Sequence, residues 1–346
     1  MKCLVTKLQS VVSDNSLKKM DEIRIQVNST GGGSLKILRR QSVEGELLIS
    51  TPDGSEKVSL TNGSWKSSVS IPIPSNYEQE TTIYVASGAY ELSVIHKNAI
   101  CGISSSDGQI FFIEPEDVSR CVNLVKYNIP NISEEFDIAL LSGLNGAEEI
   151  SFKGVNYVGN ISELKVFPRR SLTIVNTSLV GDVAILSKMT TLQSINIEQN
   201  LGLEGDILTA ISSMNDLYSV YAWKNNNLRG DLEKIKGLTK VTKLDLSKSG
   251  NITGDIKHLG RMSQLTYLAI VDTNCYGTIE EMVQSFVQNG RTSGSINMPS
   301  ANYISKVTFN GIALRTWLAN NLPGIAHAAV TWQGETITIT KMPDIV

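Results

Sequence analysis

The feature that most constrains the fold is a short phrase, glycine followed by aspartate and an aliphatic residue, that recurs through the middle of the chain. Complete copies begin at Gly181, Gly205, Gly230 and Gly254, and degenerate copies begin at Gly159 and Gly277. The steps between successive glycines are 22, 24, 25, 24 and 23 residues. A nearly constant period in the twenties predicts a stack of structural repeats, because a unit of that length buries its apolar face only against its neighbours.

Each repeat also carries a triplet in which two apolar residues flank a third residue. The triplets are Ile150–Phe152, Leu172–Ile174, Ile195–Ile197, Val220–Ala222, Leu244–Leu246 and Leu268–Ile270. Side chains alternate along a β-strand, so the flanking residues are predicted to face the core and the middle residue to face outward. Stacked triplets therefore predict a parallel β-sheet that lines one face of the array.

The complete repeat is clearest between Leu238 and Ile256, where the chain resembles the leucine-rich-repeat family in the variant whose repeats end L-x-G-x-I. The resemblance covers roughly residues 138–298. It implies a solenoid with a concave parallel sheet and short helices or turns on the convex side. It also implies a polar ladder three positions after the triplets, at Asn200, Asn225, Ser249 and Thr273. Val155 departs from this ladder, so the first copy is interpreted as a weak or capping repeat.

The aspartates of the phrase form a column, at Asp182, Asp206, Asp231 and Asp255. Each could cap the helix or turn that follows by accepting hydrogen bonds from its free N–H groups. Stacked carboxylates could also hold calcium. We interpret the column as a row of caps and predict no metal site, and we expect the glycine to let the backbone turn out of the strand layer.

The first part of the chain, residues 1–104, predicts an all-β sandwich that serves as an attachment domain. Apolar residues alternate with polar ones between turn formers, as at Ile23, Ile25 and Val27, which is typical of strands with one buried face. The first 20 residues precede this pattern and are expected to form an added strand or an attachment arm.

Segments on either side of the repeats are predicted to cover the ends of the solenoid. Before the repeats we expect a strand at residues 109–113 and a helix that starts after Ser133 and runs to Leu141. After them we expect a helix at 279–287, a seventh strand at 294–298 and a β C-terminal cap. The predicted domains are the β-sandwich (1–104), the connector and N-terminal cap (105–137), the leucine-rich-repeat solenoid (138–298) and the β C-terminal cap (299–346).

Composition narrows the classes of function. Of the 346 residues, 41% are hydrophobic and 19% are charged, and the formal net charge is −3. Because lysine and arginine do not cluster, we expect no nucleic-acid partner, and no apolar run reaches the ~18 residues of a membrane span. We expect no secretory signal, because Lys7, Gln9 and Ser10 interrupt the N-terminal apolar stretch. The four cysteines lack metal-site spacing and are expected to be reduced.

No segment carries the motif of a known catalytic site. The sequence lacks a phosphate-binding loop, a dinucleotide fingerprint, and the metalloprotease and serine-hydrolase motifs, and its three histidines lie far apart. We therefore predict a protein that is not an enzyme and that uses no cofactor.

The strongest candidate for a functional site is the outward face of the repeat strands. Tyr221, Trp223 and Tyr267 are predicted to share this face, with Lys243 and Asp245 beside them. Such aromatic side chains anchor protein interfaces and stack on sugar rings. Two interpretations stay open, namely recognition of a partner protein, a host surface protein or a glycan, and packing against the neighbouring domain or a sister subunit.

The N-terminal phrase from Met1 to Gln9, the β domain and the repeats together resemble a group of short leucine-rich-repeat proteins from gut Bacteroidetes and their tailed bacteriophages. This resemblance implies a trimeric structural protein of the virion, a head or tail fibre. Its N-terminal part would dock to other virion proteins while the repeats bind a host surface. The alternative is a bacterial leucine-rich-repeat protein of the cell surface or cytoplasm that binds protein or glycan outside any virion.

Overall fold

The computed structural model describes three parts of the chain. It describes the strands between residues 22 and 113, then residues 115–298 apart from 120, 122–123, 131, 142–143, 145, 165–166 and 292–293, and finally 307–308, 329–333 and 336–340. The predicted attachment arm in the first 20 residues lies outside the described residues. The chain divides into two compact units, Met1–Phe136 with Leu140–Ala147, and Asp137–Ala139 with Glu148–Val346.

The first unit consists mainly of antiparallel strands. One sheet has the order β5 (Ser68–Ile73), β3 (Gly45–Ser50), β7 (Gly88–Ile95), β1 (Glu22–Ser29) and β9 (Gln109–Ile113). A second row has the order β4 (Ser59–Leu60), β6 (Gln79–Val85), β2 (Gly33–Arg39), β8 (Ile100–Ser105) and β10 (Lys126–Pro130), and α2 spans Pro115–Ser119. Strands lie where the alternating residues predict them, whereas the packing of the sheets as a sandwich stays a prediction.

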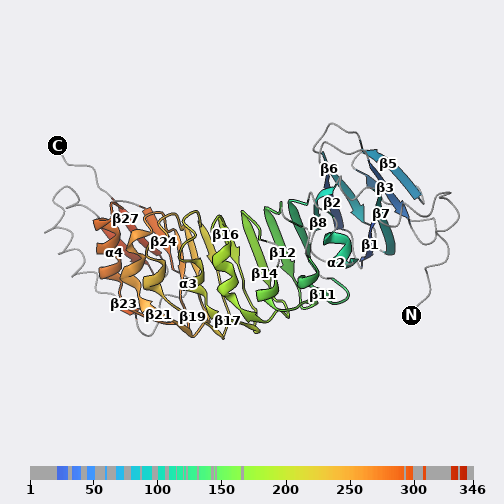
Figure 1. The fold of residues 1–346 in the computed structure, drawn as a ribbon. Coiled ribbons are helices and arrows are strands. Elements are labelled where there is room, and N and C mark those ends of the chain that lie inside the picture. Colours follow the sequence, from blue (N-terminus) through green and yellow to red (C-terminus); the bar gives the residue numbers. More distant parts are fainter. Residues whose placement is uncertain are drawn as a thin grey trace, which may run out of the picture. The chain divides into compact units, whose positions relative to one another are not determined.

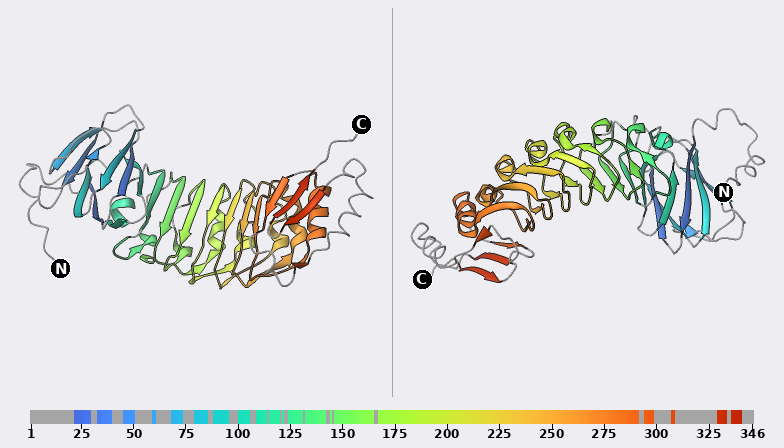
Figure 2. Two further views of the ribbon diagram at one scale, coloured as in Figure 1. Left: turned by 180° about the vertical axis from the view of Figure 1, so that it is seen from behind. Right: turned by 90° about the horizontal axis from the view of Figure 1, so that it is seen from below.

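The second unit is a solenoid whose inner sheet is built from parallel strands (Figure 1). Its strands are β12 (Glu149–Lys153), β14 (Ser171–Val175), β16 (Ser194–Asn196), β18 (Ser219–Tyr221), β20 (Lys243–Asp245), β22 (Tyr267–Ala269) and β24 (Gly294–Asn297). They overlap the predicted triplets, and every predicted inward residue is at most 1% exposed. In the right-hand view of Figure 2 these strands line the inner side of an arc and the helices follow its outer side.

A second parallel sheet, which the sequence did not predict, forms another layer of the solenoid. Its strands are β15 (Gly181–Asp182), β17 (Leu203–Asp206), β19 (Leu228–Asp231), β21 (Asn251–Asp255), β23 (Asn274–Thr278) and β25 (Val307–Thr308). The helical turns are η4 (Ile161–Glu163), η5 (Val183–Lys188), α3 (Ile207–Ile211), η6 (Leu232–Ile235), η7 (Ile256–Arg261) and α4 (Ile279–Gln288), with β13 (Tyr157–Val158) before η4. The recurring phrase therefore marks the step from this second sheet into the outer helices.

The aspartates of the phrase cap these turns, as predicted. The Oδ1 atoms of Asp182, Asp206, Asp231 and Asp255 accept hydrogen bonds from backbone N–H groups two or three residues ahead, at 2.8, 2.8, 2.8 and 3.0 Å. Gly205 has a φ of 107°, and a Cβ at this residue would lie 2.2 Å from Oδ1 of Asp182 in the preceding repeat. The phrase thus joins neighbouring repeats, because the aspartate of one lies against the glycine of the next.

The predicted polar ladder runs along the edge of the inner sheet. Oδ1 of Asn200 accepts a hydrogen bond from the N–H of Thr177 at 3.0 Å, and Oδ1 of Asn225 accepts one from the N–H of Asn200 at 2.9 Å. The N–H of Asn225 donates to Oγ of Ser249 at 3.3 Å. Both asparagines are 0% exposed, so these side chains satisfy backbone groups that water does not reach.

The helix predicted between Ser133 and Leu141 is wrong. This stretch forms a two-residue strand, β11 (Phe136–Asp137), followed by a single 3-10 turn, η3 (Ile138–Leu140). Oδ1 of Asp137 accepts a hydrogen bond from the N–H of Ala139 at 2.9 Å, and a Cβ on Gly159 would lie 2.5 Å from this oxygen. Asp137 therefore takes the place of the phrase's aspartate, and the segment turns like a repeat.

The C-terminal part of the solenoid contains the predicted helix and seventh strand, as α4 and β24. β24 pairs antiparallel with β27 (Thr336–Thr340), which pairs antiparallel with β26 (Ala329–Gln333). The role of residues 299–346 as a cap stays a prediction. Cys121 and Cys275 are buried thiols, and the reduced state of the four cysteines stays a prediction. Among the described residues, no helix combines the length and apolar character that a membrane crossing requires.

Candidate functional site

Four neighbouring strands of the inner sheet place the predicted site residues on one surface. The register pairs Asn196 of β16 with Tyr221 of β18, and Tyr221 with Asp245 of β20. Two residues earlier on β20, Lys243 pairs with Tyr267 of β22. Adjacent strands lie about 4.8 Å apart, and residues two apart in a strand face the same side. These outward residues therefore form a small lattice on the concave face.

Asp245 lies inside this lattice and is the most enclosed of the predicted site residues. Only 9% of it is exposed. Its Oδ1 accepts a hydrogen bond from the backbone N–H of Ser247 at 3.0 Å, and its Oδ2 accepts one from the hydroxyl of Tyr267 at 3.3 Å. Both donors are neutral, so these bonds orient the carboxylate without balancing its charge.

Glu198 supplies a second carboxylate, and it lies in the turn after β16 at the position that Trp223 holds after β18. Its Oε2 accepts a hydrogen bond from Nδ2 of Asn196 at 3.1 Å. Burial raises the pKa of Glu198, and the charge of Asp245 raises it further, while the hydrogen bond from Asn196 acts in the opposite direction. Within the described part of the chain, neither Glu198 nor Asp245 forms an ion pair.

The two tyrosines couple electrostatically to these carboxylates. Burial, the charge of Asp245 and the hydrogen bond to Asp245 together raise the pKa of Tyr267 to about 12. Burial is also the largest cause of the raised pKa of Tyr221, followed by the charges of Asp245 and Glu198. Both hydroxyls therefore keep their protons at neutral pH, and that of Tyr267 donates to Asp245. We call Glu198, Tyr221, Asp245 and Tyr267 the carboxylate–tyrosine cluster.

Trp223 lies two residues after Tyr221 and is flanked by lysines. The Nζ atoms of Lys224 and Lys248 lie 5.7 and 5.5 Å from the centroid of its ring, within the range of cation–π contacts. Both lysines have left-handed backbones, with φ of 58° and 54°, at the same position after their strands. The indole is half-buried and both lysines are exposed, so this corner of the face carries positive charge.

The structure therefore brings together some of the predicted residues and adds others. Tyr221, Asp245 and Tyr267 interact through hydrogen bonds and charge, whereas Lys243 is exposed and forms no ion pair among the described residues. The residues that sequence reasoning did not assign to the site are Glu198, Asn196, Lys224 and Lys248. The repeat register could have identified the first two, because they occupy outward positions beside Tyr221 and Trp223.

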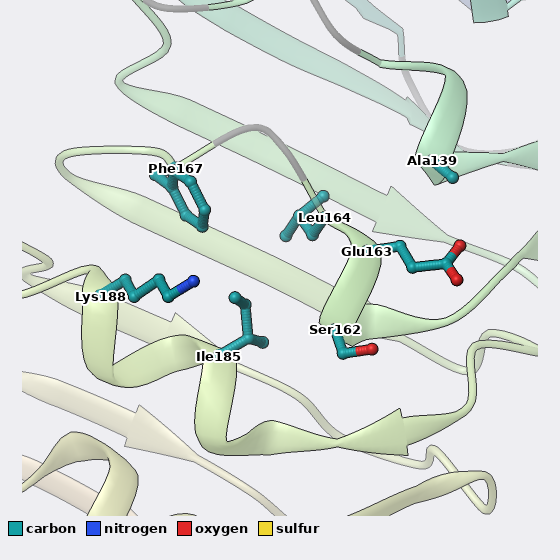
Figure 3. Close-up of a pocket in the computed structure, with 7 residues that line it drawn as sticks. All are labelled: Ala139, Ser162, Glu163, Leu164, Phe167, Ile185 and Lys188. Atoms are coloured by element: carbon teal, nitrogen blue, oxygen red, sulfur yellow. The ribbon is translucent and has the colours of Figure 1, made fainter.

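A separate pocket of about 420 Å³ lies between η4 and η5. Its lining residues are Ala139, Ser162, Glu163, Leu164, Phe167, Ile185 and Lys188. Figure 3 shows the side chains of Phe167, Ile185 and Lys188 directed toward the same space. The Ser162 hydroxyl already donates to Oδ1 of Asn160 at 2.7 Å. Because few polar groups converge on this pocket, we place the candidate site on the concave face.

Metal ligation finds no support in the aspartate column. Each of the four carboxylates accepts a capping N–H from its own helical turn, and Asp255 also pairs with Nζ of Lys257 at 2.9 Å. In the described residues, no group of three or more His, Cys, Asp and Glu side chains has an arrangement suited to a metal ion. The column therefore has a structural role between the repeats.

The comparisons with known proteins concern the fold alone. No family model matches the sequence, and no curated protein matches it. Similar solved structures include an internalin C2 from Listeria monocytogenes, with 14% identity over 63% of this chain and 85% of that chain and a TM-score of 0.42. Another is the Arabidopsis receptor kinase HAESA in complex with the peptide hormone IDA and the co-receptor SERK1. It shows 17% identity over 61% of this chain and 35% of that chain, with a TM-score of 0.47.

A third similar structure is the leucine-rich-repeat ectodomain of the receptor kinase GASSHO1/SCHENGEN3 from Arabidopsis thaliana in complex with CASPARIAN STRIP INTEGRITY FACTOR 2. It shows 19% identity over 49% of this chain, with a TM-score of 0.40, and this chain covers 21% of its length. The plant peptide hormone receptor RGFR1 in complex with RGF2 is covered over 34% of its length. The stacked parallel strands and short outer helices of this chain fit a leucine-rich-repeat fold.

Proposed function

We propose that this protein is a non-catalytic recognition protein whose concave sheet face binds a protein partner. The supporting observation is the group of half-buried aromatic side chains, Tyr221, Trp223 and Tyr267, beside the enclosed carboxylate of Asp245. Tyrosine and tryptophan dominate the energetics of protein interfaces because they combine a large apolar area with a polar end. On an exposed sheet they gain that energy only when a partner covers them.

The shape of the sheet limits the kind of partner segment that fits. The strands line the inner side of an arc (Figure 2), and such a surface receives a narrow or convex object better than a flat one. Outward positions before the aromatic strands are small and polar, at Ser171, Thr173, Ser194 and Asn196. We therefore propose that a loop or an extended segment of the partner lies along the concave face.

Selection from a displayed library of random peptides tests this proposal. We expect wild-type protein to select peptides whose affinity falls at least tenfold for the Tyr221→Ala/Trp223→Ala variant, because interface aromatics commonly contribute about 2 kcal/mol or more. The matched control is Tyr276→Ala, an exposed tyrosine on β23 of the second sheet, which should bind as wild type does. Absence of any selected peptide, or equal binding by the aromatic variant, would count against the proposal.

A glycan is the other ligand class that aromatic side chains suit, and a glycan array separates it from a protein partner. Wild type and Trp223→Ala are compared on the same array. We expect no glycan whose binding depends on Trp223. Strong binding that Trp223→Ala abolishes, together with a failed peptide selection, would replace the protein partner with a glycan.

We further propose, from the sequence resemblance alone, that the protein is a trimeric head or tail fibre of a bacteriophage virion. In this arrangement the strands of residues 1–104 pack as a sandwich that docks to other virion proteins, and residues 299–346 cap the solenoid. A bacterial protein at the cell surface or in the cytoplasm would use the same concave face. Mass spectrometry of purified particles tests the setting, and absence of the protein from them would leave the bacterial alternative.

A further inference from the structure

We propose that the partner presents a cationic side chain, an arginine or a lysine, to the carboxylate–tyrosine cluster of Glu198, Tyr221, Asp245 and Tyr267. This inference rests on the proposed recognition function and specifies the chemistry of the group that is recognised. The partner is a protein, and the group that it presents is positively charged. Binding of a glycan or of an acidic segment instead would contradict the inference.

Charge complementarity is the first argument. The charge of Asp245 acts on Glu198 across the same surface. The donors that the two carboxylates receive from within the chain are neutral, namely Nδ2 of Asn196, the N–H of Ser247 and the hydroxyl of Tyr267. Asp245 is only 9% exposed. A carboxylate that is largely removed from water and has no cationic partner gains from an ion pair, because water no longer offsets its charge.

The electrostatics of Glu198 supports the same inference. Burial and the charge of Asp245 both raise the pKa of Glu198, so the unliganded surface disfavours its ionised form. An incoming guanidinium or ammonium group reverses that effect, because an opposite charge within hydrogen-bonding distance favours the carboxylate. A neutral sugar would meet the carboxylates only with hydroxyl groups and would leave the like-charge repulsion in place.

The aromatic side chains also favour a cation on this part of the face. A cation is attracted to the face of an aromatic ring, and two tyrosines belong to the cluster. The ring of Trp223 already has Lys224 and Lys248 beside it. Those lysines repel a further positive charge. It is better accommodated at Tyr221 and Tyr267, whose pKa values the nearby carboxylate charges raise.

A pair of small probes tests the charge requirement directly. One is the N-acetylated, C-amidated peptide Gly-Gly-Arg-Gly-Gly, and the other has citrulline in place of arginine, which keeps the shape and removes the charge. Titration into the full-length protein is followed by the tyrosine and tryptophan side-chain resonances in NMR. We expect the arginine peptide to bind at least tenfold more tightly than its citrulline counterpart, and to weaken with added salt.

Two conservative variants locate the effect. Glu198→Gln removes the charge and keeps an oxygen that accepts from Asn196. Asp245→Asn removes the charge and keeps one oxygen for the N–H of Ser247, but it places an NH2 group against the hydroxyl of Tyr267. Each should weaken the arginine peptide about tenfold and leave the citrulline peptide unchanged. Glu233→Gln, which removes a carboxylate charge on the outer turn η6, is the matched control for a general change of charge, and it should bind the arginine peptide as tightly as wild type. If Asp245→Asn unfolds, Glu198→Gln alone decides.

The outcomes separate this inference from the proposed function. Equal binding of the arginine and citrulline peptides, or unchanged arginine binding by Glu198→Gln, would overturn the cation assignment. If library peptides still require Tyr221 and Trp223 in that case, protein recognition stands and only the charge inference fails. If the library yields no binder and the arginine peptide does not bind, both fail together.

Discussion

At the scale of single residues, Glu198 lies in surroundings that disfavour its charged form. Burial and Asp245 raise its pKa above the ordinary value of 4.5. The native state thus binds this proton more tightly than the unfolded chain, so the residue's contribution to stability is full below pH 4.5 and is lost as pH rises through the folded pKa. We expect Glu198→Gln to raise the free energy of unfolding at pH 7 by roughly 0.5 kcal/mol, and to give no gain at pH 3. Urea denaturation at both pH values measures this.

Glu233→Gln is the control for this substitution. Its carboxylate is exposed, and the hydrogen bond from Lys236 at 3.0 Å is the first cause of its lowered pKa. The pKa of Glu233 is therefore shifted in the opposite direction to that of Glu198, and Glu233→Gln should not raise the free energy of unfolding at pH 7. An equal gain in both variants, or a Glu198→Gln gain that persists at pH 3, would show that the effect does not come from the burial of the Glu198 charge.

Asn225 satisfies buried backbone groups in two successive repeats. Its Oδ1 accepts from the N–H of Asn200 at 2.9 Å, and its Nδ2 donates to the carbonyls of Ile197 and Ala222, each at 2.9 Å. Asn225→Ala leaves these groups without partners, so we expect a loss of about 3 kcal/mol in the free energy of unfolding. Its exposed neighbour provides the control, and Asn226→Ala should change stability by less than ~0.5 kcal/mol. Chemical denaturation compares the two, and similar losses would contradict the ladder's role.

At the scale of elements, the join between repeats depends on the glycine of the phrase. Gly205 has a φ of 107°, and a Cβ there would lie 2.2 Å from Oδ1 of Asp182. We expect Gly205→Ala to cost about 2 kcal/mol or more, from backbone strain and from this clash. Gly237 has nothing within 4 Å of the corresponding Cβ, so Gly237→Ala should be neutral or slightly stabilising. Thermal melting of both variants measures the difference. Equal shifts in melting temperature would contradict a role for the contact between Gly205 and Asp182.

The periodicity of the sequence was sufficient to predict the inner strands and the caps, because the glycine-aspartate phrase fixes the register of every repeat. It was not sufficient for the second sheet, whose strand β15 spans only Gly181–Asp182 and has no alternation of its own. The predicted helix after Ser133 failed for a related reason. Asp137 makes the phrase's cap without a preceding glycine, so the segment showed only a run of apolar residues, which fits a helix equally well.

At the scale of the whole solenoid, the site assembles from residues about one repeat apart in sequence. The register was enough to place Tyr221, Asp245 and Tyr267 on one face. The importance of Glu198 was not visible, because an isolated glutamate is typical of a solvated surface and its raised pKa depends on Asp245, two strands away. The place of Lys224 beside Trp223 follows from its left-handed backbone conformation. A lysine in the sequence does not predict that conformation, because non-glycine residues seldom adopt it.

A solenoid of this kind is stabilised mainly by contacts between neighbouring repeats, so a local defect should spread to adjacent repeats and fade with distance. Asn225→Ala removes hydrogen bonds to the repeat before it. The N–H of Asn225 also donates to Ser249 in the repeat after it, which contains β20. In hydrogen exchange followed by mass spectrometry, we expect amides of β16, β18 and β20 to exchange at least tenfold faster, since 1.4 kcal/mol corresponds to a factor of ten. The amides of β12 should change much less. Asn226→Ala should leave all four strands unchanged.

Uniformly faster exchange from β12 to β22 would instead mean that the solenoid opens as one cooperative unit. Faster exchange confined to β18 would mean that neighbouring repeats are not coupled through the ladder.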